Sequence, residues 1–194
     1  HYTVTPRILD ILQEHNARAT FFVLGNRVDN FPNIIQREYS QGHEIGSHSF
    51  SHPQITTLTS DEIEYQFAET EHRIQQYVPY TTKLVRPPYG QITQSLKEVL
   101  QKTFVLWSID TQDWKTRDKD AIVSEVLNNV KDGDIILMHD MYSTTADACE
   151  ELIPALIERG YQLVTVSELL NAKEITPVAG SVYSRVLSTG NAAS

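Results

Sequence analysis

Short apolar segments alternate with segments of helical periodicity along most of the chain, and this alternation narrows the folds available to it. Six apolar segments are predicted to be strands: residues 19–25, 43–48, 83–86, 103–110, 134–140 and 161–166. Helices are predicted at residues 32–41, 60–78, 93–102, 119–130, 145–159 and 167–171. Strands that alternate with helices are typical of an α/β fold with a parallel sheet. An open doubly wound sheet and a small, incomplete (β/α) barrel both fit this pattern.

Turn and cap residues mark several of the expected boundaries. Thr59 and Glu62 have the spacing of a capping box at the start of the second helix. The Pro87-Pro88 pair should end the third strand, because proline cannot donate to a sheet ladder. From residue 173 the chain is rich in Ser, Gly, Ala and Thr, so we expect residues 173–194 to wrap the surface or to be disordered. Residues 1–172 should then form one compact domain.

Composition excludes several classes of protein. The formal net charge of −9 argues against a nucleic-acid groove and against binding to an anionic membrane surface. No predicted strand is followed by a G-x-G-x-x-G or Walker A loop, so nucleotide binding has no support. The single cysteine, Cys149, excludes an internal disulfide, and we expect a partly buried helix residue there rather than a nucleophile.

Polar side chains stand where four of the predicted strands end. They are His48 and His52, Arg86, Asp110, and His139 with Asp140. Because parallel β/α folds gather the carboxyl ends of their strands on one face, these side chains are expected to converge on one pocket. This placement favours the incomplete barrel over the open sheet.

The segment His48-Ser-Phe-Ser-His52-Pro is the one most typical of a metal site. Two imidazoles four positions apart can share one cation from a tight loop. Two surface histidines that cap a loop would leave the same pattern. A catalytic zinc normally has three protein ligands, so a third ligand must come from elsewhere. His1, His15, His43 and His72 lack such context and are expected to be structural or solvated.

Arg86-Pro-Pro-Tyr89-Gly is predicted to form a rigid turn at the end of the third strand. In a catalytic role, Arg86 could orient a carboxylate and the Tyr89 N–H could stabilise an oxyanion. In a structural role, the prolines only terminate the strand and Arg86 pairs with a surface acid.

The fourth and fifth strand ends carry a carboxylate and an imidazole. Burying a lone histidine is costly, so His139 should have a partner, and Asp110 on the neighbouring strand is the natural candidate. Such a pair would fix the tautomer of a general acid. Trp114 suits the apolar side of a sugar or acetyl site. Ordinary core packing of Trp114 and His139 is the alternative.

The ordered set of these motifs resembles the polysaccharide deacetylase family, which is carbohydrate esterase family 4 with its NodB-homology domain. The segments ATFFVLG, H-S-x-x-H-P, R-P-P-Y-G, D-x-x-D-W and L-x-H-D occur here in the order of the family, over residues 1–170. The resemblance implies a distorted (β/α) barrel with residues 1–172 as catalytic domain. It also implies a hydrolase that cleaves amide C–N bonds to remove N-acetyl groups, using Zn²⁺ or Co²⁺.

Roles follow from the resemblance, position by position. His48 and His52 correspond to two metal ligands, and the third, an aspartate, is expected upstream of residue 1. Arg86 corresponds to the arginine that orients the catalytic base, and the Tyr89 amide to the oxyanion donor, beside the substrate.

The catalytic acid and the acetyl pocket are implied in the same way. His139 corresponds to the acid and Asp110 to its partner, while Trp114 and Leu137 correspond to substrate-binding residues that line the acetyl pocket.

The family's first motif, T-F-D-D-G-P, supplies the base and the aspartate ligand, and it does not occur in this chain. Residues 5–13 resemble the helix that follows it. We therefore expect an N-terminal strand to be missing, either outside this sequence or as a separate N-terminal fragment that partners the chain.

The substrate expected from the resemblance is peptidoglycan N-acetylglucosamine. The alternative substrates are chitin and acetylated xylan. The protein could instead be a catalytically dead member that binds glycan, or a non-enzymatic scaffold. From the family alone, the protein is expected to be extracellular, or anchored to the cell wall or the outer membrane face.

Overall fold

The computed structural model describes residues 2–187, and within this range the chain divides into two compact units. The sheet unit contains residues 20–106 and 177–183. The second unit contains residues 107–176 together with the described residues of 1–19 and 184–194. His1, which we expected to be structural or solvated, lies outside the described residues.

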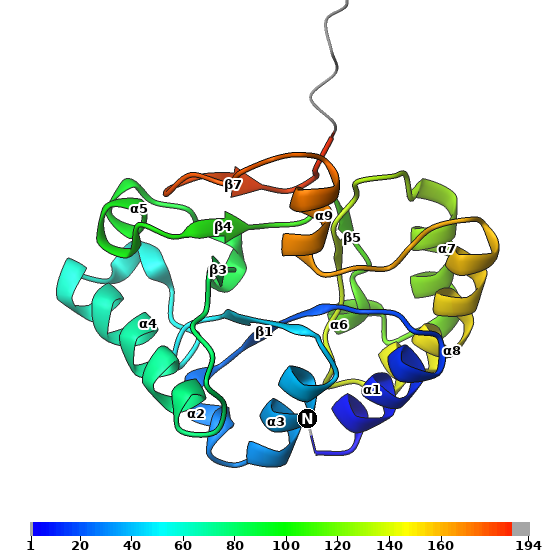
Figure 1. The fold of residues 1–194 in the computed structure, drawn as a ribbon, viewed down its shortest axis with the longest axis horizontal. Helices are drawn as coiled ribbons and strands as arrows, with labels where there is room; N and C mark the ends of the chain where they lie inside the picture. Colours follow the sequence, from blue (N-terminus) through cyan, green and yellow to red (C-terminus); the bar gives the residue numbers. More distant parts are fainter. Residues whose placement is uncertain (1, 188–194) are drawn as a thin grey trace, which may run out of the picture. The chain divides into compact units, whose positions relative to one another are not determined.

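The sheet unit is built on a five-stranded, fully parallel sheet with the order β1-β2-β3-β4-β7. The strands are β1 (Thr20–Val23), β2 (Glu44–Ser47), β3 (Leu84–Val85), β4 (Thr103–Val105) and β7 (Val182–Tyr183). Figure 1 shows β7, from the end of the chain, beside β4. The predicted α/β fold with a parallel sheet is therefore confirmed.

Four helices belong to this unit: α2 (Gly25–Val28), α3 (Pro32–Ser40), α4 (Ser60–Gln75) and α5 (Gln94–Leu100). The capping box predicted at Thr59 is present, with both reciprocal hydrogen bonds to Glu62. Helix α4 buries Ile63 and Phe67 in one core cluster and Ile74 in another, so its apolar face holds it to the sheet unit. Short 3₁₀ turns follow β2 and β3, at Ile55–Thr57 and Pro88–Gly90.

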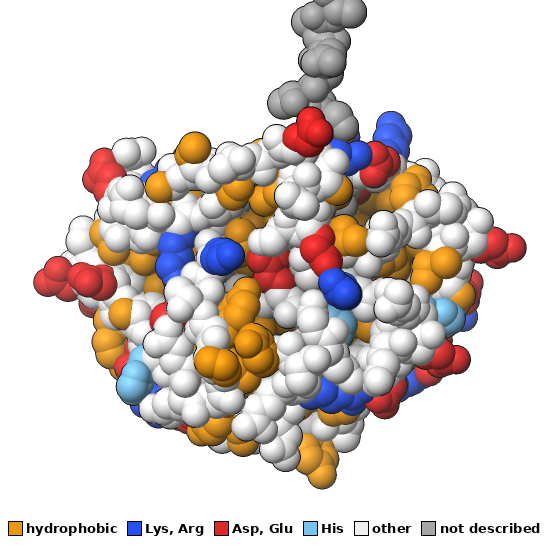
Figure 2. Space-filling model, viewed as in Figure 1, with side chains coloured by type: hydrophobic (Ala, Val, Ile, Leu, Met, Phe, Trp, Pro, Cys, Tyr) orange, Lys and Arg blue, Asp and Glu red, His pale blue; other side chains and the backbone are white. Residues whose placement is uncertain are grey.

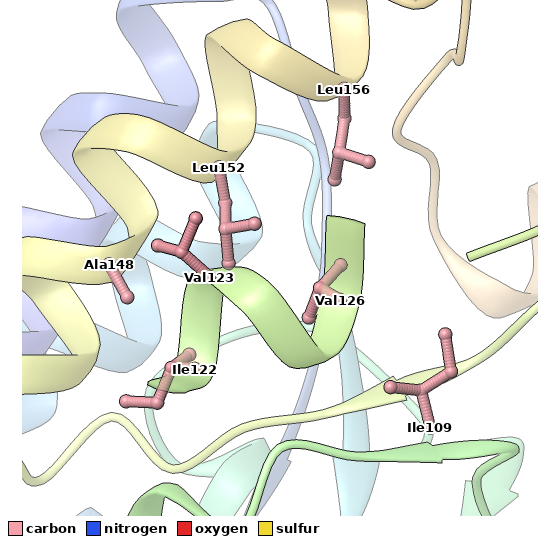
Figure 3. Close-up of a cluster of buried hydrophobic side chains, with 7 residues drawn as sticks. All are labelled: Ile109, Ile122, Val123, Val126, Ala148, Leu152 and Leu156. Carbon is pink, nitrogen blue, oxygen red and sulfur yellow. The ribbon is translucent and has the colours of Figure 1, made fainter. Parts of the chain in front are cut away.

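The second unit pairs β5 (Ile109–Asp110) with β6 (Ile136–Leu137) in parallel. Its helices are α1 (Val4–Glu14), α6 (Asp113–Thr116), α7 (Lys119–Asn129), α8 (Ser143–Glu158) and α9 (Val166–Ala172). The α7 and α8 helices pack through a buried apolar cluster that also takes in Ile109 (Figure 3). Cys149 lies in a helix, α8, as predicted, but it is buried rather than partly buried, and burial raises the pKa of its thiol to about 12.

Two strand predictions are wrong. The segment 103–110 forms two strands, β4 and β5, that belong to different sheets. The chain leaves the first sheet at Val105 and Leu106, whose carbonyl oxygens accept hydrogen bonds from the Arg86 side chain. Residues 161–165 form no strand; Tyr161 and Leu163 are partly buried against the α7–α8 cluster instead.

The sequence also did not predict β7, which lies in the segment expected to be surface chain or disordered. Phe104 N–H donates to the Ser181 oxygen and Leu106 N–H to the Tyr183 oxygen, at 2.7 and 2.8 Å. Residues 188–194 lie outside the described range. The division at residue 172 stays a prediction.

No helix among residues 2–187 is long and apolar enough to cross a membrane. On the face drawn in Figure 2, Lys and Arg side chains are interspersed with Asp and Glu.

Candidate active site

His48 follows directly after β2, and its ring orientation is fixed by the neighbouring strand. Its backbone N–H donates to the Val23 oxygen at 2.9 Å, which continues the β1–β2 pairing. Its ring Nδ1 lies 2.6 Å from the Arg86 carbonyl oxygen. A carbonyl oxygen can only accept, so Nδ1 carries the hydrogen, and in the neutral ring Nε2 is the atom with a lone pair. Metal-binding histidines are commonly oriented in this way.

His52 lies in a tight loop beside His48. Its backbone is left-handed (φ 62°), and its N–H donates to the Ser49 hydroxyl at 3.0 Å. The two imidazole rings are 5.0 Å apart between centroids, and both are half-buried. The loop therefore brings the two rings together as a shared cation requires. No group of three or more His, Cys, Asp or Glu side chains suited to a metal occurs among the described residues.

Arg86 is buried and follows directly after β3. Its guanidinium lies 4.3 Å from the centre of the Phe22 ring and donates to the Val105 and Leu106 oxygens at 3.3 and 2.9 Å. Burial lowers the pKa of Arg86 to about 10. Gly46 leaves room for the Phe22 ring, since a Cβ there would lie 2.5 Å from it. The predicted contact of Arg86 with a catalytic base stays a prediction.

Tyr89 occupies the rigid turn predicted after β3. Its backbone is left-handed (φ 58°), and Gly90 N–H closes the turn on the Pro87 oxygen at 3.1 Å. The Tyr89 ring is exposed, and its centroid lies 4.7 Å from that of His52. The turn thus places the Tyr89 residue next to the histidine loop.

In the second unit, the partner of His139 is Asp113 and not Asp110. The His139 ring Nδ1 lies 2.7 Å from Asp113 Oδ1, and the His139 N–H donates to Asp113 Oδ2, also at 2.7 Å. The Thr145 hydroxyl donates to the same carboxylate at 2.8 Å. Burial alone would raise the pKa of Asp113, but these hydrogen bonds outweigh it and hold that pKa below its ordinary value.

Asp110 makes a local contact instead, accepting from Gln112 N–H at 2.9 Å. Asp110 was predicted to be the partner of His139 because both lie at strand ends. The actual partner is Asp113, the second aspartate of the D-x-x-D-W motif. Asp113 begins α6, and its carboxylate also accepts from Trp114 N–H, so it bonds His139, just after β6, from a short helix. In the sequence, the only feature that distinguishes Asp113 from Asp110 is the tryptophan that follows it, Trp114.

The predicted acetyl-pocket residues lie close to this pair in the sequence. Leu137 is buried, and its carbonyl accepts from the Thr111 hydroxyl at 2.8 Å. Trp114 is 48% exposed, which argues against the core-packing alternative. The residues of the sheet unit and those of the second unit each form an ordered group. Their convergence on one pocket stays a prediction.

Comparison with known proteins defines the class. The family model of polysaccharide deacetylases matches residues 2–105. The chain is 45% identical over 170 residues to peptidoglycan-N-acetylmuramic acid deacetylase PdaC of Bacillus subtilis, covering 88% of this chain and 36% of PdaC. It is 39% identical over 171 residues to peptidoglycan-N-acetylglucosamine deacetylase PgdA of Listeria monocytogenes, covering 88% and 37%.

Solved structures of the same family are also similar to this chain. A family 4 acetyl xylan esterase of Clostridium thermocellum, in complex with a cobalt ion, is 35% identical with a TM-score of 0.91, covering 96% of this chain and 94% of that one. A family 4 pseudoenzyme of Bacillus anthracis is 33% identical with a TM-score of 0.81, covering 86% and 60%.

The chain belongs to the polysaccharide deacetylase family, carbohydrate esterase family 4. It spans a little over a third of the length of PdaC and PgdA. The predicted family is confirmed.

Proposed function

We propose that this protein is a metal-dependent hydrolase that removes N-acetyl groups from peptidoglycan N-acetylglucosamine. The observation that carries the proposal is the buried Asp113 carboxylate, which holds His139 through two hydrogen bonds of 2.7 Å. A carboxylate that holds an imidazole at Nδ1 and leaves Nε2 to face a substrate is the arrangement that general acid–base catalysis uses.

His48 and His52 are proposed to hold a Zn²⁺ or Co²⁺ ion. They suit it because Nδ1 of His48 donates to the Arg86 oxygen, which leaves Nε2 as the ligand atom. When bound, such an ion polarises the substrate carbonyl and lowers the pKa of water. The aspartate expected as third ligand stays a prediction.

The other residues of the candidate site have separate proposed roles in catalysis and substrate binding. Water gives a proton to the catalytic base and adds to the amide carbonyl, the C–N bond breaks, and His139 Nε2 gives a proton to the leaving amine, so that acetate and a free amino sugar result. The Tyr89 N–H is proposed to stabilise the oxyanion, and Arg86 to orient the base. Trp114 and Leu137 are proposed to line the acetyl pocket.

The choice of substrate is tested by a panel of glycans given to the full-length, metal-loaded protein. Peptidoglycan, chitooligosaccharides and acetylated xylan are incubated with it, and the products are analysed by mass spectrometry. We expect loss of acetyl from N-acetylglucosamine of peptidoglycan. Loss from N-acetylmuramic acid or from xylan would instead assign the activity named for PdaC or for the acetyl xylan esterase, which are the alternatives that similarity supports.

We propose that the protein acts outside the cell or at the cell wall. This follows from the proposed substrate, which lies there, and from the peptidoglycan deacetylases among its relatives.

A further inference from the structure

Gln66, a residue of α4, forms hydrogen bonds with the loop between His48 and His52. The Gln66 Oε1 atom accepts hydrogen bonds from two consecutive backbone N–H groups, those of Phe50 and Ser51, at 3.0 and 2.9 Å. The amide Nε2 of Gln66 donates to the Ser51 hydroxyl at 3.0 Å. Gln66 itself is half-buried. These hydrogen bonds thus hold the residues in the middle of the loop, between the two histidines.

The carbonyl side of the same loop is bound separately, by the start of α2. Gly25 N–H donates to the Ser49 oxygen at 3.1 Å, and Asn26 N–H donates to the Phe50 oxygen at 3.0 Å. The loop is therefore fixed through its oxygens by backbone groups and through its nitrogens by Gln66.

The loop needs such support because two of its residues have left-handed backbones. Ser49 has φ 72° and His52 has φ 62°, and neither is glycine. Residues in this region persist where the surrounding structure holds them there. The His48 ring is held independently by the Arg86 oxygen, so the ring whose position depends most on the loop is that of His52.

We infer that Gln66 is a positioning residue of the metal site, setting the spacing of the two imidazoles through the loop amides. The inference rests on the proposed function, since it assumes that His48 and His52 bind the metal. Outer groups that orient metal ligands typically change affinity by about 10- to 100-fold. Gln66 should act on the metal affinity and on the ligand geometry.

The test uses the full-length protein with Gln66→Met, which keeps the length of the side chain and removes the acceptor. Gln66→Glu keeps an acceptor oxygen for both N–H groups. Gln75→Met is the matched control, because Gln75 lies on the same helix and bonds Glu71 instead of the loop. Zinc dissociation constants are measured by competition with a chelator, and the cobalt-substituted forms are compared by absorption spectroscopy.

We expect Gln66→Met to weaken zinc binding by about 10- to 100-fold and to alter the cobalt spectrum. Gln66→Glu and Gln75→Met should stay close to wild type in both measurements. If Gln66→Met does not fold, Ser51→Ala removes the hydroxyl that orients Gln66 and should weaken binding in the same direction, by less.

Wild-type affinity and an unchanged cobalt spectrum in Gln66→Met, or in Ser51→Ala where Gln66→Met is unfolded, would overturn the inference while leaving the proposed function intact. Equal losses in Gln66→Met and Gln75→Met would also overturn it, as a general effect of α4. A wild-type protein that binds no zinc would reject the proposed function and this inference together.

Discussion

The Asp113 carboxylate accepts two hydrogen bonds from His139, one from the backbone N–H and one from the ring Nδ1, each 2.7 Å long. An ionised carboxylate can only accept, and the pKa of Asp113 is lowered, so Nδ1 carries a hydrogen at neutral pH. The other ring nitrogen, Nε2, is left to exchange protons with a substrate. Substitutions of Asp113 or His139 should therefore affect proton transfer.

Asp113→Asn should lower kcat strongly, by a factor of about 10² to 10⁴, because the asparagine amide can donate to Nδ1 and select the wrong tautomer. Asp110→Asn is the matched control, since Asp110 bonds only its local Gln112 N–H among the contacts described. It should retain most of the activity. Steady-state kinetics of both variants tests this, and an equal loss in both would restore Asp110 to the role first predicted for it.

The stability of the fold should depend on pH through Asp113. Its folded-state pKa lies below the ordinary value of 3.8. Its contribution is therefore fully present above pH 3.8 and is lost as pH falls through the lower, folded-state pKa. Urea unfolding of wild type and Asp113→Asn should give a difference in free energy that is constant near neutrality and shrinks in acid. A difference independent of pH would contradict the assignment.

Alanine substitutions should separate metal binding from proton transfer. His48→Ala and His52→Ala should each lose both metal and activity, because either removes one of the two imidazole ligands. His139→Ala should keep the metal and lose activity by a factor of about 10² to 10⁴. Metal content is measured beside acetate release. Full occupancy in the double variant of His48 and His52, or near-normal turnover in His139→Ala, would refute the corresponding role.

Gly133 permits a close backbone contact with the segment that follows β7. Its φ is +87°, its oxygen accepts from Val186 N–H at 2.8 Å, and an added Cβ would lie 1.9 Å from the Val186 oxygen. Gly133→Ala should cost about 3 kcal/mol or more in the free energy of unfolding. Gly160→Ala has the same φ and nothing within 4 Å, so it should cost about 1–2 kcal/mol. Similar losses would show that Val186 adjusts freely.

Amphipathic helices were predictable because their apolar spacing and caps are local. Helix α4 begins at the expected capping box, and α7 occupies residues 119–129 against the predicted 119–130. The strands were less predictable, since pairing depends on partners far along the chain. β7 is short, without a long apolar run, and pairs with β4, while Tyr161 and Leu163 pack partly buried against the α7–α8 cluster without pairing.

In the candidate site, too, contacts between residues close in the sequence were predictable and contacts between distant residues were not. His48 and His52 are close in the sequence, and the structure places their rings side by side. The predicted partner of His139 was wrong because Asp110, at a strand end, was preferred to Asp113, which lies three residues further along the chain. The start of α6 at Asp113 places that carboxylate against His139. Thr145, which also donates to Asp113, comes from α8 and had no signal in the motif.

Acetate release from peptidoglycan by the full-length protein tests the central claim most directly. The protein is assayed as purified, after removal of metal by a chelator, and after zinc is added back, with His139→Ala in parallel. We expect release that disappears on chelation, returns with zinc, and stays near background in His139→Ala at full zinc occupancy. No release by the zinc-loaded wild type from any acetylated glycan would contradict the account and favour a glycan-binding pseudoenzyme.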